Sequence, residues 1–287
     1  MKTPAHTLLV DIGNTRVKWS TLRGSKQSRM QAAAHQDSGL ALRALVRDAP
    51  RDVARVVVVS VVDEALSRVL DDAARRRFGV APEYIASSRR ACGVTNSYRD
   101  TWRLGADRWV SSIGAYSLAG GRAVVIANAG TALTIDAVTA GGRHRGGAIV
   151  PGPKVMVDSL LSGTHGIRRR AQGGDTSVRS LFATDTASAL AAGSQFAAAA
   201  FIDRACVVAQ YRSRHCHGAV PAIRSRGWAE LRGGERTGDA VRCAVPWAHH
   251  RPDGCRDRAA DPLRRKADRP FNASADGPGA IGSASDG

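Results

Sequence analysis

Eight residues in the first quarter of the chain restrict the possible fold more than any other stretch. Residues 55–62 read RVVVVSVV and consist almost entirely of β-branched side chains, without polar alternation. Such a run is typical of a strand that is covered on both faces, whereas a strand with one solvated face alternates apolar and polar residues. A strand covered on both faces needs other layers on both sides of its sheet. The sequence therefore predicts a layered α/β fold.

Strand and helix patterns alternate on either side of this run. Predicted strands lie at residues 7–10, 17–22, 83–85, 122–127, 133–138 and 146–152. Predicted helices lie at residues 40–47, 64–78, 107–118, 153–161 and 186–210. The last of these is rich in alanine, with apolar residues spaced by three and four, and is the clearest long helix.

The composition suits a globular protein and raises one alternative function. The 287 residues are 43% hydrophobic, enough to fill a sizeable core, and carry a formal net charge of +17. Clustered basic residues would favour binding to the phosphates of a nucleic acid. The arginines are instead spread along the whole chain and only 5% of the residues are aromatic, which disfavours nucleic-acid binding.

Patterns for targeting and for metal binding are weak. The first residues, MKTPAHTLLV, reach an aspartate after three apolar residues, unlike a signal peptide, and no apolar run is long enough to span a membrane. We therefore expect a cytoplasmic protein. The five cysteines lack C-x-x-C spacing, and the HCH triplet at 215–217 has no second ligand pair. The sequence thus predicts neither a zinc site nor a disulfide framework.

The character of the chain changes abruptly after about residue 211. Residues 212–287 contain 13 arginines and half of the histidines, but only two leucines and two isoleucines. They show neither strand nor helix periodicity, and their composition resembles that of a disordered segment. A small irregular subdomain is the alternative interpretation.

Two short stretches combine strands with polar, glycine-containing tips. The sequence DIGNT follows the first predicted strand, and NAGT occupies the same place between the strands at 122–127 and 133–138. Asp11 corresponds to Asn128, Gly13 to Gly130, and Thr15 to Thr131. One such tip is explained by an ordinary hairpin turn. Two matching tips favour duplicated subdomains that face each other, and a nucleotide could then be held from both sides.

The chemistry of these tips suits a phosphate group. A glycine lets backbone N–H groups approach an anion closely, and a threonine adds a hydroxyl donor. Asp11 would repel a triphosphate unless Mg²⁺ lay between them, and Asp136 is a possible second carboxylate. Lys18 could contact the phosphates or remain solvated. The chain has no G-x-x-x-x-G-K-[ST] motif and is therefore not a P-loop protein.

The sequence RLGADRW at 103–109 offers a group that could accept a proton from an attacking hydroxyl. Gly105 permits a tight turn, Asp107 lies where a helix should begin, and Arg108 follows it. An aspartate near a helix start is also a common capping residue that needs no catalytic role. Spacing alone leaves both interpretations open.

Five ordered motifs carry a resemblance to a known family: DIGNTRVKW, Tyr98 followed by RLGADRW, NAGTALTID, GGAIVPG and FATDT. Together they resemble the type III pantothenate kinases, within the superfamily of acetate and sugar kinases, Hsp70 and actin. The match spans about residues 6–210. It implies two duplicated, ribonuclease H-like (actin-like ATPase) subdomains around a nucleotide cleft: residues 1–118, and residues 119–211 as an incomplete second subdomain. Residues 212–287 would form an irregular or disordered tail.

The resemblance implies a kinase that transfers the γ-phosphate of ATP to the primary hydroxyl of pantothenate, the first step of coenzyme A synthesis. It implies Mg²⁺, a monovalent cation (K⁺ or NH₄⁺) and a homodimer with its site at the subunit interface. Asp107 is similar to the family's proton acceptor, and Arg108 suits the substrate carboxylate. The residues similar to ATP contacts are Asp11, Ile12, Gly13, Asn14, Thr15, Arg16, Val17, Lys18 and Thr131. Those similar to substrate contacts are Tyr98, Gly105, Ala106, Asp107, Arg108 and Thr186.

The chain departs from the family pattern in two places. Asn128 stands where family members usually carry an aspartate associated with the monovalent cation, so the amide supplies an oxygen without a charge. The segment RGGERTGDA at 232–240 has the family's glycines without the preceding apolar strand. The tail thus resembles a chain translated out of its ancestral frame, which would make the chain inactive. Some proteins that resemble this family are described as Bvg accessory factors, and a regulator of transcription is the other alternative.

Overall fold

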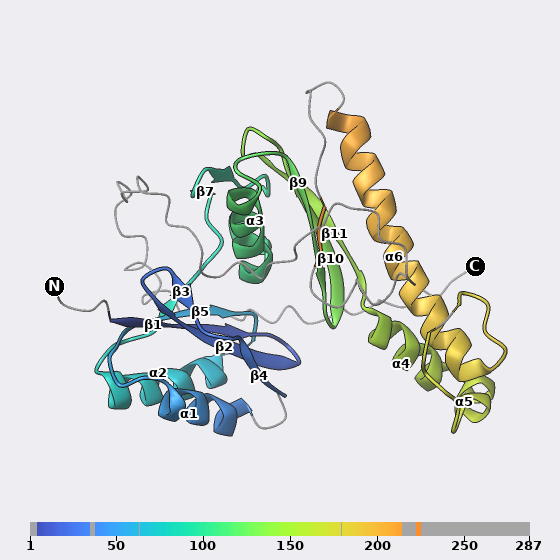
Figure 1. Ribbon diagram of the computed structural model, residues 1–287, viewed down its shortest axis with the longest axis horizontal. Helices are drawn as coiled ribbons and strands as arrows, with labels where there is room; N and C mark the ends of the chain where they lie inside the picture. Colours follow the sequence, from blue (N-terminus) through green and yellow to red (C-terminus); the bar gives the residue numbers. More distant parts are fainter. Residues whose placement is uncertain (1–4, 35–37, 63, 179, 214–221, 225–287) are drawn as a thin grey trace, which may run out of the picture. The chain divides into compact units, whose positions relative to one another are not determined.

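The computed structural model describes residues 5–34, 38–62, 64–178, 180–213 and 222–224. Within them the chain forms a mixed α/β structure with two main sheets and a small two-stranded ribbon (Figure 1). The predicted α/β class is therefore confirmed. The expectations for the HCH triplet, for RGGERTGDA and for nearly all of the tail lie outside the described residues.

The first sheet has the strand order β3-β2-β1-β5-β6, and a further strand, β4, pairs with β2. Strands β1 and β2 are antiparallel, whereas β5 runs parallel to both β1 and β6. The strands are β1 (His6–Ile12), β2 (Arg16–Arg23), β3 (Lys26–Gln27), β4 (Gln31–Ala34), β5 (Val53–Ser60) and β6 (Glu83–Tyr84). Helices α1 (Ser38–Asp48) and α2 (Glu64–Phe78) cover one face of this sheet (Figure 1).

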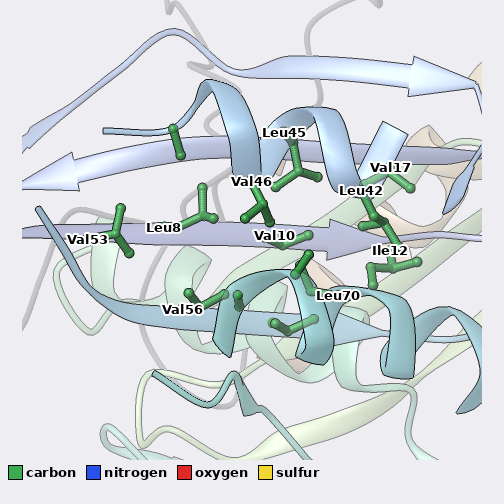
Figure 2. Close-up of a cluster of buried hydrophobic side chains, with 14 residues drawn as sticks. Leu8, Val10, Ile12, Val17, Leu42, Leu45, Val46, Val53, Val56 and Leu70 are labelled. Carbon is green, nitrogen blue, oxygen red and sulfur yellow. The ribbon is translucent and has the colours of Figure 1, made fainter. Parts of the chain in front are cut away.

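Alternating residues of the central strands build the core beneath these two helices. Leu8, Val10 and Ile12 of β1 point toward the helices, as does Val56 of β5, where they meet Leu42 and Leu45 of α1 and Leu70 of α2 (Figure 2). Val58 of β5 belongs to the same buried cluster. The valine-rich strand is covered on both faces only toward its end, since Val58 and Val59 are both buried while Ala54 and Arg55 are exposed. Our prediction for this strand therefore holds for its second half.

A ribbon and a short 3-10 helix connect the first sheet to the next helix. The ribbon consists of β7 (Arg90–Ala91) and β8 (Val94–Thr95), and the 3-10 helix spans Thr101–Arg103. Helix α3 (Ala106–Leu118) follows directly. The sequence did not predict the ribbon, because two-residue strands are too short to show any alternation.

The second sheet has the strand order β11-β10-β9-β12. It is formed by β9 (Val124–Ala129), β10 (Ala132–Val138), β11 (His144–Pro151) and β12 (Ala222–Arg224). Strands β9, β10 and β11 are antiparallel neighbours, and β12 runs parallel to β9. Strand β12 lies in a range where we expected no regular structure. Three residues carry no detectable periodicity, and it is the pairing with β9 that defines them as a strand.

Helices lie on both faces of the second sheet. Trp109 and Ala115 of α3 pack against Val124 and Ile126 on one face. Ala198 and Ile202 of helix α6 (Thr186–Ser213) pack against Leu133 and Ile135 on the other face. Helices α4 (Pro153–Gly163) and α5 (His165–Ala171) pack against α6. Because α3 and α6 are on opposite faces (Figure 1), the second sheet separates them.

Candidate active site

The tips of two hairpins meet in the structure. Ile12 and Val17 pair across the first hairpin, and Ala129 and Leu133 pair across the second, so their loops contain residues 13–16 and 130–132. The side-chain hydroxyls of Thr15 and Thr131 are hydrogen-bonded to each other. Two hydroxyl groups that are 116 residues apart in the sequence are thus in direct contact.

Both glycines use their backbone N–H groups to close their own turns. The amide of Gly13 donates to the carbonyl oxygen of Arg16, and that of Gly130 donates to the carbonyl oxygen of Ala132, each at 3.0 Å. These two amides are therefore engaged within the hairpins. The groups at the first tip that can turn toward a ligand are those of the exposed residues Asn14, Thr15 and Arg16.

The residues beside the first tip divide into core and surface. Ile12 and Val17 are fully buried among the apolar side chains beneath α1 and α2, so only their backbone groups could contact a ligand. Asp11 and Lys18 are directly opposite each other on β1 and β2, with 3.4 Å between Lys18 Nζ and Asp11 Oδ2. Their side chains are on the sheet face opposite to the two helices, since side chains alternate along a strand.

The carboxyl group of Asp11 is electrostatically perturbed. Burial raises its pKa, the positive charge and hydrogen bond of Lys18 oppose that rise, and the negative charge of Asp107 adds to it. The net pKa is above the ordinary value for an aspartate. Asp107 belongs to α3, so two carboxylates from different elements act on the same region.

Replacing Asp11 by asparagine should raise the free energy of unfolding at neutral pH. Because the pKa of Asp11 is higher in the folded chain than in the unfolded chain, its ionised form destabilises the fold. This gain in the free energy of unfolding should be full at a pH above the raised pKa of Asp11. It should shrink as the pH falls from the raised pKa toward the ordinary pKa of an aspartate. Thermal melting across this pH range, with a chelator present, measures the effect.

Asp48 provides the control for this prediction. It is exposed, and a hydrogen bond from Arg47 lowers its pKa, so its shift has the opposite sign. Asp48→Asn should give no gain in melting temperature at neutral pH. A melting temperature of Asp11→Asn at or below that of the unchanged chain would contradict the sign of the Asp11 shift.

Helix α3 begins at the second predicted motif. Gly105 is the N-cap residue and makes no side-chain hydrogen bond to the helix, and Asp107 lies in the first turn. The capping position that could explain an aspartate here is thus occupied by Gly105. The carboxylate of Asp107 folds over Gly105, because a Cβ atom at Gly105 would lie 2.6 Å from Asp107 Oδ1. Asp107 is exposed, whereas the next residue, Arg108, is buried.

Arg108 forms a bidentate ion pair with Asp136 of β10. The distances are 2.8 Å from Nε to Oδ2 and 2.6 Å from Nη2 to Oδ1. The remaining nitrogen, Nη1, lies 3.3 Å from the hydroxyl of Tyr98. Burial acts to lower the pKa of Arg108, but the hydrogen bonds and charge of Asp136 outweigh it and raise the pKa. The guanidinium therefore stays charged.

Our interpretation of Asp136 as a second Mg²⁺ carboxylate is wrong. Asp136 is buried, and its two oxygens accept hydrogen bonds from Arg108 and from His144 Nε2, the latter at 2.9 Å. Sequence reasoning missed His144, because a lone histidine at the start of a strand carries no motif. The alternation of side chains along β10 could have indicated the partner of Asp136. It places Asp136 on the same face as Val138, which packs toward α3.

Two predicted site residues, Thr186 and Asn128, lie outside the cluster formed by Asp107, Arg108 and Tyr98. Thr186 is half-buried and begins α6, and this helix is on the face of the second sheet opposite to α3, where Asp107 and Arg108 lie. Asn128 is half-buried on β9, directly opposite Thr134 of β10. The hydroxyl of Thr134 is buried and has no hydrogen-bond partner among the described residues.

The described part of the chain contains neither a clustered metal-binding group nor a membrane-spanning helix. No group of three or more histidine, cysteine, aspartate or glutamate residues is arranged to hold a metal ion there. No helix in the same ranges combines the length and apolar character needed to cross a membrane.

Comparison with known proteins defines the class of this chain. The sequence profile described as "Type III pantothenate kinase" matches residues 7–207. A type III pantothenate kinase of Nitrosococcus oceani is 35% identical over 203 residues, which cover 69% of this chain and 75% of that protein. One from Methylibium petroleiphilum is 39% identical over 209 residues, with coverages of 69% and 78%. These matches define a kinase.

A third sequence relative and one solved structure complete the comparison. A type III pantothenate kinase of Janthinobacterium sp. (strain Marseille) is 34% identical over 234 residues, covering 78% of this chain and 87% of that protein. The ethanolamine utilization protein EutJ of Carboxydothermus hydrogenoformans has a TM-score of 0.38 and 10% identity, with 77% of each chain covered. The chain belongs to the type III pantothenate kinase family.

Proposed function

We propose that this chain transfers the γ-phosphate of ATP to the primary hydroxyl of pantothenate, the first step of coenzyme A synthesis. The observation that carries the proposal is the meeting of two threonine-bearing tips beside Asp11, whose pKa responds to the charge of Asp107. A phosphate donor site and a proton acceptor are thereby close to each other, in a chain of this family. Phosphoryl transfer needs this combination of positioning and charge.

ATP would bind between the two tips as the phosphate donor. The hydroxyls of Thr15 and Thr131 would exchange their mutual hydrogen bond for phosphate oxygens. Backbone groups of Asp11 to Lys18 would line the same site, and Ile12 and Val17 would take part through the backbone alone because their side chains are in the core. Lys18, which is partly exposed beside Asp11, would add a positive charge.

Asp11 suits Mg²⁺ held near the phosphates. Its carboxylate is partly buried and its pKa is raised even though Lys18 Nζ lies 3.4 Å away, so a bound cation would offset the cost of keeping it ionised. When bound, Mg²⁺ would neutralise charge on the phosphates. One carboxylate with water is a common set of Mg²⁺ ligands in proteins.

Asp107 would accept the proton of the attacking alcohol. As the pantothenate oxygen forms its bond to the γ-phosphorus, the bond from that phosphorus to the β,γ-bridging oxygen breaks and ADP leaves. The hydroxyl proton passes to Asp107. Its exposed carboxylate in the first turn of α3 is accessible to such a substrate.

The remaining substrate contacts would come from two subunits of a homodimer acting in the cytoplasm. Gly105, Ala106 and Arg108 are neighbours of Asp107 at the start of α3, and the hydroxyl of Tyr98 contacts Arg108. Thr186 begins a helix on the opposite face of the second sheet, so we assign its contact to the site of the neighbouring subunit. Such a site would be complete only in the dimer.

Neutral oxygen atoms at Asn128 suit a monovalent cation better than Mg²⁺. The side chains of Asn128 and Thr134 share one face of the second sheet, since the two residues are directly paired. The buried, unpartnered hydroxyl of Thr134 would gain a ligand there. K⁺ or NH₄⁺ would be held without the charge that an aspartate supplies.

Duplicated actin-like subdomains are part of the same proposal. The first sheet contains the order β3-β2-β1-β5 and the second the order β11-β10-β9-β12. In both, an antiparallel three-stranded meander is followed by a strand parallel to its first member. The two threonine tips occupy equivalent first turns of the two meanders.

A direct assay tests the proposal. The purified full chain with ATP, Mg²⁺, K⁺ and pantothenate should produce ADP and phosphopantothenate in equal amounts, measured by mass spectrometry and a coupled ADP assay. Omission of pantothenate is the control for ATP hydrolysis. A folded chain that makes no phosphopantothenate would overturn the proposal and would favour a regulator or an inactive product of a damaged reading frame.

Mixing two defective variants tests the shared site. Asp107→Asn removes the proton acceptor, and Thr186→Glu places a bulky charged side chain where the substrate of the neighbouring subunit should make its contact. A hybrid dimer of the two contains one site with neither defect. Equal mixing and exchange should therefore restore about a quarter of the activity. Failure to restore activity in demonstrated hybrid dimers would contradict a site shared between subunits.

A further inference from the structure

The guanidinium of Arg108 has one edge that is paired with Asp136 and an opposite end that contacts Tyr98. Asp136 takes the edge formed by Nε and Nη2, at 2.8 and 2.6 Å. Nη1 faces the hydroxyl of half-buried Tyr98 at 3.3 Å. A guanidinium is rigid and planar, so fixing one edge in two places also fixes the direction of the remaining N–H groups.

Asp136 is itself held from the neighbouring strand. His144 of β11 is fully buried, and its Nε2 lies 2.9 Å from Asp136 Oδ1. On the other side of the ring, His144 Nδ1 is 3.4 Å from the hydroxyl of Ser97. A continuous chain of polar contacts thus runs from Ser97 through β11 and β10 to the first turn of α3.

A glycine on β11 makes space for this arrangement. Gly147 pairs with Asp136 across the sheet. A Cβ atom at Gly147 would lie 2.4 Å from both Arg108 Nη2 and Asp136 Oδ1. The ion pair therefore passes over the backbone of β11 where no side chain is present.

The charges of this pair have a consequence for recognition. Arg108 and Asp136 neutralise each other, so the pair offers a ligand little net charge. Affinity for a carboxylate must then depend on where the free N–H groups of Arg108 point. A misdirected guanidinium would lose hydrogen bonds to the ligand even while it remains charged.

We infer that Asp136, held by His144, is a positioning residue that aims Nη1 of Arg108 at the carboxylate of the acceptor substrate. The inference rests on the proposed function, because it needs pantothenate to be the substrate whose carboxylate binds Arg108. Asp136 touches neither substrate in this assignment and acts only through Arg108. Its loss should affect use of the acceptor and leave use of ATP unchanged.

Asp136→Asn is the direct test in the full chain. The amide keeps the size of the carboxylate but presents N–H groups to one side of the guanidinium, where two donors face each other. KM for pantothenate should rise roughly 10- to 100-fold, while KM for ATP stays within about twofold. Glu83→Gln is the matched control, because Arg55 and Glu83 form an ion pair of similar geometry, at 2.9 and 2.6 Å, in the first sheet. It should change neither KM.

Two further variants keep the test decisive if Asp136→Asn folds poorly. His144→Gln keeps an N–H donor for Asp136 and should retain KM for pantothenate, whereas His144→Leu should raise it.

The outcomes separate the inference from the proposed function. An unchanged chain that does not phosphorylate pantothenate overturns the proposed function, and the inference with it. An active chain whose Asp136→Asn and His144→Leu variants keep KM for pantothenate overturns the inference alone. Equal rises in both KM values would also overturn it, because they would indicate a general loss of structure.

Discussion

Replacing Asp107 by asparagine should lower kcat for phosphorylation of pantothenate by about 100-fold or more, the usual contribution of a positioned general base. The amide cannot accept the hydroxyl proton, whereas the exposed side chain makes little contribution to folding. The melting temperature should therefore stay close to that of the unchanged chain. Steady-state kinetics with saturating ATP and pantothenate, together with thermal melting, measure both effects.

Asp100 offers a matched control for this substitution. It is another exposed aspartate just before α3 and pairs with Arg103 at 3.1 Å. Asp100→Asn removes a carboxylate from the same segment and should leave kcat within about twofold, because exposed ion pairs contribute little. Near-normal turnover in Asp107→Asn would reject Asp107 as the proton acceptor.

Gly152→Ala should disturb the second threonine tip and lower stability together. A Cβ atom at Gly152 would lie 2.1 Å from the carbonyl oxygen of Gly130 and 2.8 Å from that of Thr131. Backbone dihedrals at Gly152, φ −70° and ψ 163°, suit alanine, so the effect is steric alone. We expect a loss of about 1–3 kcal/mol in the free energy of unfolding. KM for ATP should rise at least about fivefold, because Thr131 must move.

A second glycine separates this effect from a general response to alanine. Gly193 lies inside α6, and a Cβ atom there would meet no atom within 4 Å. Gly193→Ala should raise the free energy of unfolding by about 0.5–1 kcal/mol through helix propensity. It should leave KM for ATP unchanged. Normal KM for ATP and normal melting in Gly152→Ala would contradict the close packing of the second tip.

Long, strongly patterned elements were predictable from the sequence. The helix expected at 64–78 coincides with α2, because Leu70 and Ala74 recur on the face that covers the first sheet. The helix expected at 107–118 differs from α3 by one residue at its start. In both, the apolar spacing that we counted is the spacing that the packing requires.

Short elements were not predictable, because their existence depends on partners far along the chain. Strand β4 pairs with β2 and β12 pairs with β9, and neither has enough residues to show a period. Helix α5 has seven residues, three of which are consecutive arginines. Local sequence gives weak information where pairing with a distant strand or packing on another helix determines the structure.

The candidate site divides in the same way. The two threonine tips are visible in the sequence because each is a local turn with its own motif, and the structure brings them into contact. The partner of Arg108 is 28 residues away, and a carboxylate beside a glycine-rich motif is equally suited to a metal. Only the register of β10 against α3 and β11 identifies Asp136 as the partner of an arginine.

With the roles proposed for Asp107 and Arg108, the first turn of α3 also restricts how the range of acceptor substrates can diverge. Asp107 and Arg108 are consecutive, and one side chain is exposed while the other is buried, as expected for helix positions about 100° apart. Rotating the helix to suit a different acceptor would move both groups at once. New substrate preferences should therefore arise through residues outside this turn, with the turn itself inherited as one unit.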